Sequence, residues 1–453
     1  MTAQAGSVER AVAFEDLFFS TTDRKGVIDG SNTVFCHYAQ YSMDELLGAP
    51  HNIIRHPDMP GGVFHIMWDL LLSGRPMAGY VANLAADGAT YWVFATITPL
   101  GDGFLSVRQR PCVTDTFRTA AALYDQVRPA ELEARREGAS RAQAARSGAE
   151  TIQEAIAGLG FADYSDFIRH AVPAEVAARR AATSWTAPDP RDPVDGVTRG
   201  LVDAAISVDR ALDTQEAALA ELEALSGALA EASARTVGSV AQLDGAVMSA
   251  TSASREVSDT QPVLAKVARP LAETSGWLRG AFDELARLLG RARLGISELQ
   301  LRNALARLHD ETLAEFAREM AASEAPERAP VYVQQLCHAL EETATTVTRE
   351  MAMTHAILDD VADALTEVQE KMLEFQRLLA TWRLLIPRYG LSRQLDPYTG
   401  PIDEQLNAGL TLIGQVRELA QQCVTSARRL DAEPLSTAVG AVVDAREAAV
   451  HAA

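Results

Sequence analysis

Cysteine is scarce in this chain and is never clustered. The four cysteines, Cys36, Cys112, Cys337 and Cys423, lie far apart, and no CxxC spacing occurs. This pattern disfavours a zinc site or a disulfide framework and is typical of a reducing compartment. We therefore expect no metal site and a cytoplasmic protein.

Long hydrophobic runs are also absent. No apolar stretch reaches the ~18–20 residues that a membrane-spanning helix needs. The first residues, MTAQAGSVERAVAFEDLFF, lack a basic segment followed by an apolar core, so they do not resemble a signal peptide. We expect no insertion into a membrane.

Basic residues are in the minority. The chain has 41 lysines and arginines against 61 aspartates and glutamates, a formal net charge of -20. A broad acidic surface disfavours nucleic acids and anionic membranes as partners. The same acidic excess can also serve solubility alone.

Aromatic residues make up only 6% of the 453 residues, and alanine is abundant after about residue 118. This composition favours long helices over sheet, and the length allows two or three folding units. Glycine-rich phosphate loops and nucleophile elbows are missing, and the helices carry no cluster of catalytic carboxylates or histidines. We expect no enzymatic activity, and a flavin enzyme is the weakest of the functions considered.

Residues 17–117 differ from the rest of the chain in residue types and pattern, and they follow a small polar tail at residues 1–16. Runs of β-favouring and aromatic residues alternate with turn signals and helix caps. The expected strands are 17–22, 25–29, 77–84, 90–99 and 104–110, and the expected helices are 35–41, 42–48 and 62–73. In the fourth strand, Tyr91, Val93, Ala95 and Ile97 share one face, which can line a cavity while the other face packs elsewhere.

This order of elements is that of a PAS domain, an α+β fold with a five-stranded antiparallel sheet and flanking short helices. The stretch PHNIIRHPDMPGGVFHIMW at residues 50–68 makes the likeness specific. The chain resembles the PAS sensor of bacterial aerotaxis receptors in these segments: TTD at 21–23, Asn32, ELLG at 45–48, PHN at 50–52, RHPDMP at 55–60, MW at 67–68, Asn83 and YWV at 91–93. That resemblance implies noncovalent FAD in the PAS cavity, with the redox state of the flavin serving as a proxy for oxygen and respiration.

The resemblance implies a set of cofactor-binding residues, and their chemistry suits a flavin. Arginine offers a forked set of donors to phosphate, histidine donates and can change charge near neutral pH, asparagine both donates and accepts, and tryptophan stacks. The predicted cofactor-binding residues are Asn32, Arg55, His56, Asp58, Trp68, Asn83 and Trp92.

Each of these residues also has a purely structural interpretation. Asp58 is placed to cap the helix that follows Pro60, and Arg55 can simply pair with Asp58. His56 suits an ordinary turn, and Trp68 at helical spacing suits a core. Asn83 is the hardest to explain structurally because strands disfavour asparagine. Two other states of the cavity stay open: haem held by His37, His51, His56 or His65, and an empty cavity that serves only in dimerisation.

The rest of the chain is expected to be helical. Residues 118–185 form a helical connector broken near 159–164 and at Val172-Pro173, and the proline- and aspartate-rich residues 186–197 form a linker. Beyond it, breaks at Gln261-Pro262, 323–330 and 387–401 divide residues 198–453 into four helices of roughly 50–60 residues, far above the usual ~11–12.

Apolar residues in the long helices recur at alternating spacings of three and four. Such heptad seams predict an antiparallel bundle or coiled coil, and we expect a homodimer. The first seam is Val240, Leu243, Val247, Ala250, Ser254 and Val257, and the second is Leu358, Val361, Leu365, Val368, Met372, Phe375, Leu379, Trp382 and Ile386. The receptor tip that engages a chemotaxis kinase has no match, so the signalling partner stays unnamed. A flavin sensor coupled to these helices and a cofactor-free interaction scaffold are the two leading functions.

Overall fold

The computed structural model describes residues 8–183, 196–321 and 329–452. The chain forms two compact units. The first combines residues 1–216, 297–348 and 432–453, and the second combines residues 217–296 and 349–431. The expected boundary between an N-terminal domain and a separate helical module is therefore not where the chain divides, because the ends of the long helices belong to the first unit. The predicted linker at 186–197 lies largely outside the described residues, and α7 already begins at Gly196.

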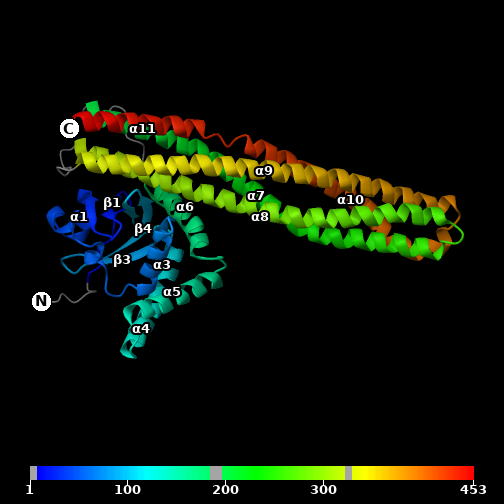
Figure 1. Cartoon of the computed structure of the whole chain (residues 1–453), viewed down its shortest axis with the longest axis horizontal. Coiled ribbons are helices and arrows are strands. Elements are labelled where there is room, and N and C mark those ends of the chain that lie inside the picture. Colours follow the sequence, from blue (N-terminus) through cyan, green and yellow to red (C-terminus); the bar gives the residue numbers. More distant parts are fainter. Residues whose placement is uncertain (1–7, 184–195, 322–328, 453) are drawn as a thin grey trace. The chain divides into compact units, whose positions relative to one another are not determined.

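Five antiparallel strands form the sheet of the first unit, in the order β2-β1-β5-β4-β3. Figure 1 labels β1, β3 and β4 of this sheet. Their bounds are β1 (Phe18–Asp23), β2 (Ile28–Ser31), β3 (Met77–Leu84), β4 (Thr90–Leu100) and β5 (Gly103–Gln109). The helices between β2 and β3 are α1 (Thr33–Ala39), α2 (Met43–Leu46), the 3-10 helix η1 (His51–Ile54) and α3 (Gly61–Leu72). The expected α+β fold is confirmed, with strand ends shifted by at most three residues.

Local sequence signals start and stop the short helices. Asn32 caps α1, and Ser42 with Glu45 forms a capping box on α2. Gly48 then turns the chain with φ +80°, a conformation that favours glycine. These signals are local in sequence, which is why these helices could be predicted.

The two faces of the sheet have different neighbours. On the inner face, Phe18 packs between Phe35 and Tyr38 of α1, and Tyr91 and Val93 join the same core. The predicted alternation along β4 is therefore confirmed. Residues 8–16 are no loose tail: Arg10 N donates to Thr90 O at 2.8 Å, and Val12 is buried.

Three helices follow the sheet: α4 (Thr114–Arg136), α5 (Arg141–Gly158) and α6 (Tyr164–Ala182). The expected interruption near 159–164 is present, but the one at Val172-Pro173 is wrong because α6 runs through Pro173. Burial explains this, since Val172 and Val176 are both buried on that helix. Glu175 of α6 also accepts hydrogen bonds from Tyr80 Oη at 2.7 Å and from Cys112 N at 2.7 Å.

One segment of a long helix packs against the outer face of the sheet. Residues 303–314 of α8 (Pro262–Ala321) are all buried, although they include several charged and polar side chains. Nearby Phe316 meets Phe19 of β1 edge-on at 5.4 Å between ring centroids. Arg179 of α6 forms a buried ion pair with Glu311. A helix segment that is buried all round belongs to a core, so residues 303–314 of α8 form one packed body with the sheet within the first unit.

His309, in this buried segment, should make the first unit sensitive to acid. Its ring lies 3.1 Å from Thr343 Oγ1, and burial lowers its pKa to about 4. Between about pH 6.5 and 4 the unfolded state therefore binds a proton that the folded state does not, so stability falls as the pH falls. We expect the free energy of unfolding of His309→Gln to fall by about 1.4 kcal/mol less per pH unit than that of the wild type over this range.

The measurement for His309→Gln is amide exchange in β1 and β5 at several pH values. His338→Gln on α9, where the histidine is half-exposed, is the matched control. Burial raises the pKa of Asp209 to about 6, so this group changes stability with pH in the direction opposite to His309. Because Asp209 is present in both the wild type and His309→Gln, the difference between their slopes isolates His309. Equal slopes for the wild type and His309→Gln would contradict the prediction.

The second unit is a four-helix bundle. It contains parts of α7 (Gly196–Glu256), α8 and α9 (Ala329–Arg388), and the whole of α10 (Ser392–Ala427). All nine apolar residues of the second predicted seam are buried, from Leu358 to Ile386. In the first seam Val247 is only half-buried, and the side chain of Val240 lies outside the described part. Consecutive helices joined by the short turn at 389–391 run antiparallel, as expected (Figure 1).

The fourth long helix is in fact two helices, α10 and α11 (Glu433–Ala452), of which α11 belongs to the first unit. The predicted break at 387–401 is also shorter than expected, because Pro397 and Pro401 lie inside α10. Within the described ranges, no helix has both the length and the apolar character that crossing a membrane requires.

Candidate ligand cavity

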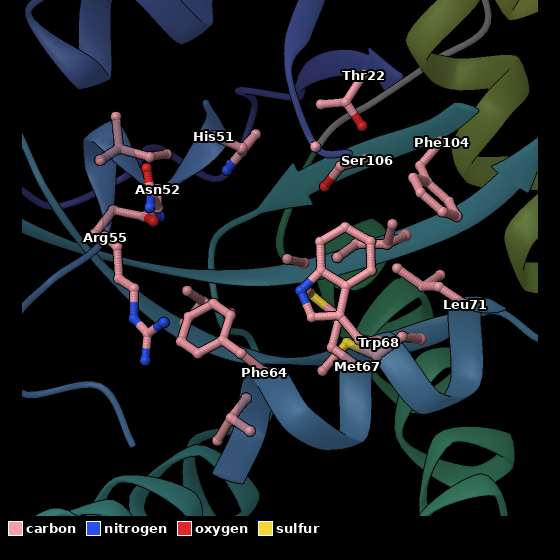
Figure 2. Close-up of a pocket in the computed structure, with 18 of the residues that line it drawn as sticks. Thr22, His51, Asn52, Arg55, Phe64, Met67, Trp68, Leu71, Phe104 and Ser106 are labelled. Carbon is pink, nitrogen blue, oxygen red and sulfur yellow. The ribbon is translucent and has the colours of Figure 1, made fainter. Parts of the chain in front are cut away.

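A cavity of about 330 Å3 lies between the inner face of the sheet, α3 and the turn that precedes α3 (Figure 2). The helix contributes apolar side chains at helical spacing, and β4 contributes the face predicted to line a cavity, Val93, Ala95 and Ile97. The indole of Trp68 projects into the middle of the cavity and meets Phe104 edge-on at 5.8 Å (Figure 2). Apolar walls with few polar groups are typical of small-molecule sites.

Three polar atoms of the lining residues are buried without a hydrogen-bond partner. They are Asn83 Nδ2, Ser106 Oγ and Arg108 Nη1. Each comes from a strand position on the inner face, on β3 or β5. Buried donors without partners are costly, so these atoms mark a place suited to a ligand that accepts hydrogen bonds.

Arg108 is the most unusual residue of the cavity. Its Nη2 donates to Ser20 Oγ at 2.9 Å, and its guanidinium carbon lies 4.9 Å from the ring centroid of Phe35. Burial lowers its pKa to about 10, so the side chain stays charged at neutral pH. Among the described residues no carboxylate pairs with it. The structure thus holds a buried positive charge that faces a cavity.

The Nε2 atom of His51 accepts a second hydrogen bond from Arg108 Nη2. Burial and the neighbouring Arg108 lower the pKa of His51 to about 3, so its ring is neutral. The other three candidate haem ligands, His37, His56 and His65, do not line the cavity. Because Nε2 of His51 faces a guanidinium, the geometry disfavours haem ligation by this residue.

Arg55 lines the cavity at its side, where its guanidinium lies over the ring of Phe64, 3.7 Å from the ring centroid (Figure 2). Its Nη2 donates to Met59 O at 3.5 Å, and its backbone forms an isolated bridge with Asn83. The alternative pairing with Asp58 is not found among the described ion pairs. Arg55, Trp68 and Asn83 are therefore the predicted residues that the fold brings to the cavity.

The other four predicted residues lie outside the lining, and their proposed direct contacts need correction. Asn32 Oδ1 accepts from Phe19 N at 3.2 Å, and its Nδ2 donates to Leu17 O, so its amide is used within the fold. Trp92 points to the opposite face of β4 and packs against Phe117 at 5.2 Å. The strand alternation already implied this, because Trp92 and Val93 cannot share a face.

His56 and Asp58 shape the turn before α3. His56 Nδ1 accepts from Asp58 N at 3.2 Å, and burial lowers the pKa of His56. The side chain of Asp58 is 81% exposed and does not cap α3, whose N-cap residue is Pro60. The structural interpretation of Asp58 as a helix cap is therefore wrong.

Sequence reasoning missed Ser106 and Arg108 as cavity residues. The signal was present in β5, because Phe104, Ser106 and Arg108 alternate and must share one face. An arginine at such an inward position is informative, since buried arginines normally have partners.

Comparison with known proteins agrees with the fold. Residues 30–104 match the protein family described as the PAS fold. Over 104 residues the chain is 38% identical to the aerotaxis receptor of Escherichia coli (strain K12), covering 22% of this chain and 21% of that protein. Over 81 residues it is 33% identical to the nitrogen fixation regulatory protein of Klebsiella pneumoniae, covering 18% and 16%. The chain thus spans about a fifth or less of the length of these curated relatives.

Two solved structures are similar over the same fraction of the chain. The light-state structure of the blue-light photoreceptor Aureochrome1 LOV is 18% identical with a TM-score of 0.21, covering 23% of this chain and 88% of that chain. The PAS domain of a protein from Colwellia psychrerythraea is 23% identical with a TM-score of 0.19, covering 22% and 86%.

Proposed function

Because residues 30–104 form a PAS domain related to that of an aerotaxis receptor, we propose that this protein is a cytoplasmic redox sensor. In this proposal the PAS cavity binds FAD, and the helical part of the chain receives the signal. The protein works as a homodimer, acts on a signalling partner rather than as an enzyme, and reports oxygen or respiration in an aerotaxis-like pathway.

The observation that carries the proposal is the set of unpartnered atoms in the cavity. A flavin ring is flat and apolar on its faces, and it has several hydrogen-bonding atoms along one edge. The apolar walls suit the faces, and Asn83 Nδ2, Ser106 Oγ and Arg108 Nη1 suit the edge. The volume of about 330 Å3 falls in the ~300–1,000 Å3 range of small-molecule sites.

The remaining parts of FAD need different groups. Arg55 and the exposed Lys25 both line the cavity and are the cations that could meet the pyrophosphate. Trp68 supplies an aromatic face within the cavity. These assignments leave Asn32 and Trp92 to the fold rather than to the cofactor.

A bound flavin would supply reversible electron transfer, with a change of charge and protonation on its ring. Arg108 is suited to respond to that change, because a buried cation interacts more strongly with new negative charge than an exposed one does. His51 also holds the guanidinium, because its Nε2 atom accepts from Arg108 Nη2, and its ring remains neutral. Redox-dependent rearrangement of these side chains would bias the packing around the cavity.

An absorbance spectrum of the purified full chain, recorded before and after dithionite, tests the proposal. We expect the spectrum of an oxidised flavin, its bleaching on reduction, and release of FAD on denaturation. The absorbance spectrum of a haem protein would mean that the cavity binds haem and not FAD. A colourless protein that releases no flavin would favour the cofactor-free scaffold.

Asn83→Ala should weaken FAD binding without weakening the fold. One Asn83 amide donor has no partner in the protein, so its removal costs the ligand-free protein little. Loss of a hydrogen bond of about 0.5–1.5 kcal/mol predicts roughly twofold to tenfold weaker binding, measured by flavin fluorescence titration. Asn407→Ala, at an exposed position of α10, is the control. Unchanged affinity and unchanged signalling for Asn83→Ala would support the scaffold instead.

A further inference from the structure

Helix α3 forms one wall of the cavity, and a carboxylate from another helix holds its N-terminus. Glu131 of α4 accepts from Gly61 N at 2.7 Å through Oε2 and from Gly62 N at 2.8 Å through Oε1. The Glu131 side chain is only 3% exposed. Both bonds are charge-assisted, and a negative charge is favourable at the N-terminus of a helix.

This arrangement supplies what α3 itself lacks. The N-cap residue of α3 is Pro60, which has no side-chain acceptor, and no side-chain bond caps the helix locally. The first amide groups of a helix need partners from outside its own hydrogen-bond ladder. A residue about seventy positions further along the chain therefore completes α3.

The backbones of α3 and α5 touch at the same place. A Cβ added at Gly62 would lie 2.4 Å from the backbone carbon of Gly148, and a Cβ added at Gly148 would lie 2.1 Å from Glu131 Oε1. Only glycine fits at both positions without displacing a neighbour. The three helices are therefore closely packed at this point, so a shift of α3 must also displace α4 and α5.

Arg128, one turn before Glu131 on α4, extends the same contact to the turn that contains Arg55. Its Nε donates to Pro57 O at 3.0 Å, and its Nη1 lies 3.3 Å from Glu131 Oε2. The α4–α5 hairpin thus holds both the turn and the first residues of the helix that carries Phe64 and Trp68.

We infer that Glu131 is a positioning residue of the cavity, and that the α4–α5 hairpin responds to the state of the cavity through its contacts with α3. The inference rests on the proposed binding of FAD. Glu131 touches no ligand itself; it fixes where α3 places its side chains. A change in the contents of the cavity that moves α3 is transmitted to α5 through the carboxylate and the paired glycines.

The test compares Glu131→Gln with Glu133→Gln in the full chain. Glu133 lies on the same helix, its side chain is exposed, and it forms an ion pair with Arg136. Apoprotein is titrated with FAD, and amide exchange of α3 and α5 is recorded with and without FAD. We expect Glu131→Gln to bind FAD about tenfold more weakly, or about 1.4 kcal/mol, and to lose the FAD-dependent change in α5. Glu133→Gln should behave as the wild type.

Gly148→Ala is the second variant, because it displaces the carboxylate while leaving its chemistry intact. It should reproduce both effects of Glu131→Gln. Suppose that the wild type binds FAD and that Glu131→Gln and Gly148→Ala have the same FAD affinity and the same amide exchange in α5 as the wild type. The inference about Glu131 then fails, while the flavin proposal stands. If the wild type binds no FAD, the proposed function fails first.

Discussion

Arg108→Met is expected to change flavin binding and stability in opposite directions. The variant should bind FAD roughly 10–100-fold more weakly, because it loses a charged donor worth about 1.5–3 kcal/mol at the edge of the cavity. The ligand-free protein should become more stable by about 1 kcal/mol or more, because an unpaired charge leaves the interior. Methionine is flexible enough to fill the space of the arginine stem.

Two measurements check this prediction in the full chain. Flavin titration gives the affinity, and amide exchange in β1 and β5 of the ligand-free protein gives the stability near the replaced side chain. Arg24→Met removes the same charge from an exposed position and should change neither. A loss of stability together with unchanged affinity would show that Arg108 is structural and that its charge does not serve a ligand.

Trp382→Ala is expected to be the most destabilising single substitution in the second unit. Trp382 is fully buried in the predicted seam of α9, and its Nε1 donates to Ser254 Oγ of α7 at 2.9 Å. Truncation removes a large apolar side chain and leaves a cavity, a change that typically costs about 3–5 kcal/mol. Amide exchange along α7 and α9 measures the effect, and it should be much smaller within the sheet of the first unit.

Leu384→Ala is the control for this bundle prediction, because Leu384 is two residues further along α9 and 69% exposed. Leu384→Ala should change amide exchange along α7 and α9 only slightly, because an exposed apolar side chain buries little surface on folding. Equal effects of the two variants would mean that the seam on α9 does not face the core of the bundle.

Several parts of the fold follow from the sequence by itself. The strands β3, β4 and β5, the capping box on α2 and the seam from Leu358 to Ile386 all came from periodicity and turn residues. These features depend on side chains a few residues apart, whose geometry is fixed by the helix or strand that contains them. The resemblance to the aerotaxis-receptor PAS sensor indicated Arg55, Trp68 and Asn83, and the fold brings these three residues to one cavity.

Other parts depend on residues that are distant in the sequence. The cap of α3 comes from Glu131 on α4, and no local pattern near Asp58 predicts it. The buried polar segment at 303–314 looks like an ordinary exposed helix face until the sheet packs against it. The alternation of β5 places Arg108 on the inner face, but only the finished fold shows that no carboxylate of the described residues pairs with it.

The sequence by itself therefore determined the PAS fold, the helical remainder and three of the residues that could meet a flavin, Arg55, Trp68 and Asn83. The tertiary structure decided which of those residues face the cavity, what holds its wall and where the chain divides into two units. The physical reason is that burial and charge compensation depend on which segments pack together. Helix periodicity and strand alternation are properties of each segment alone.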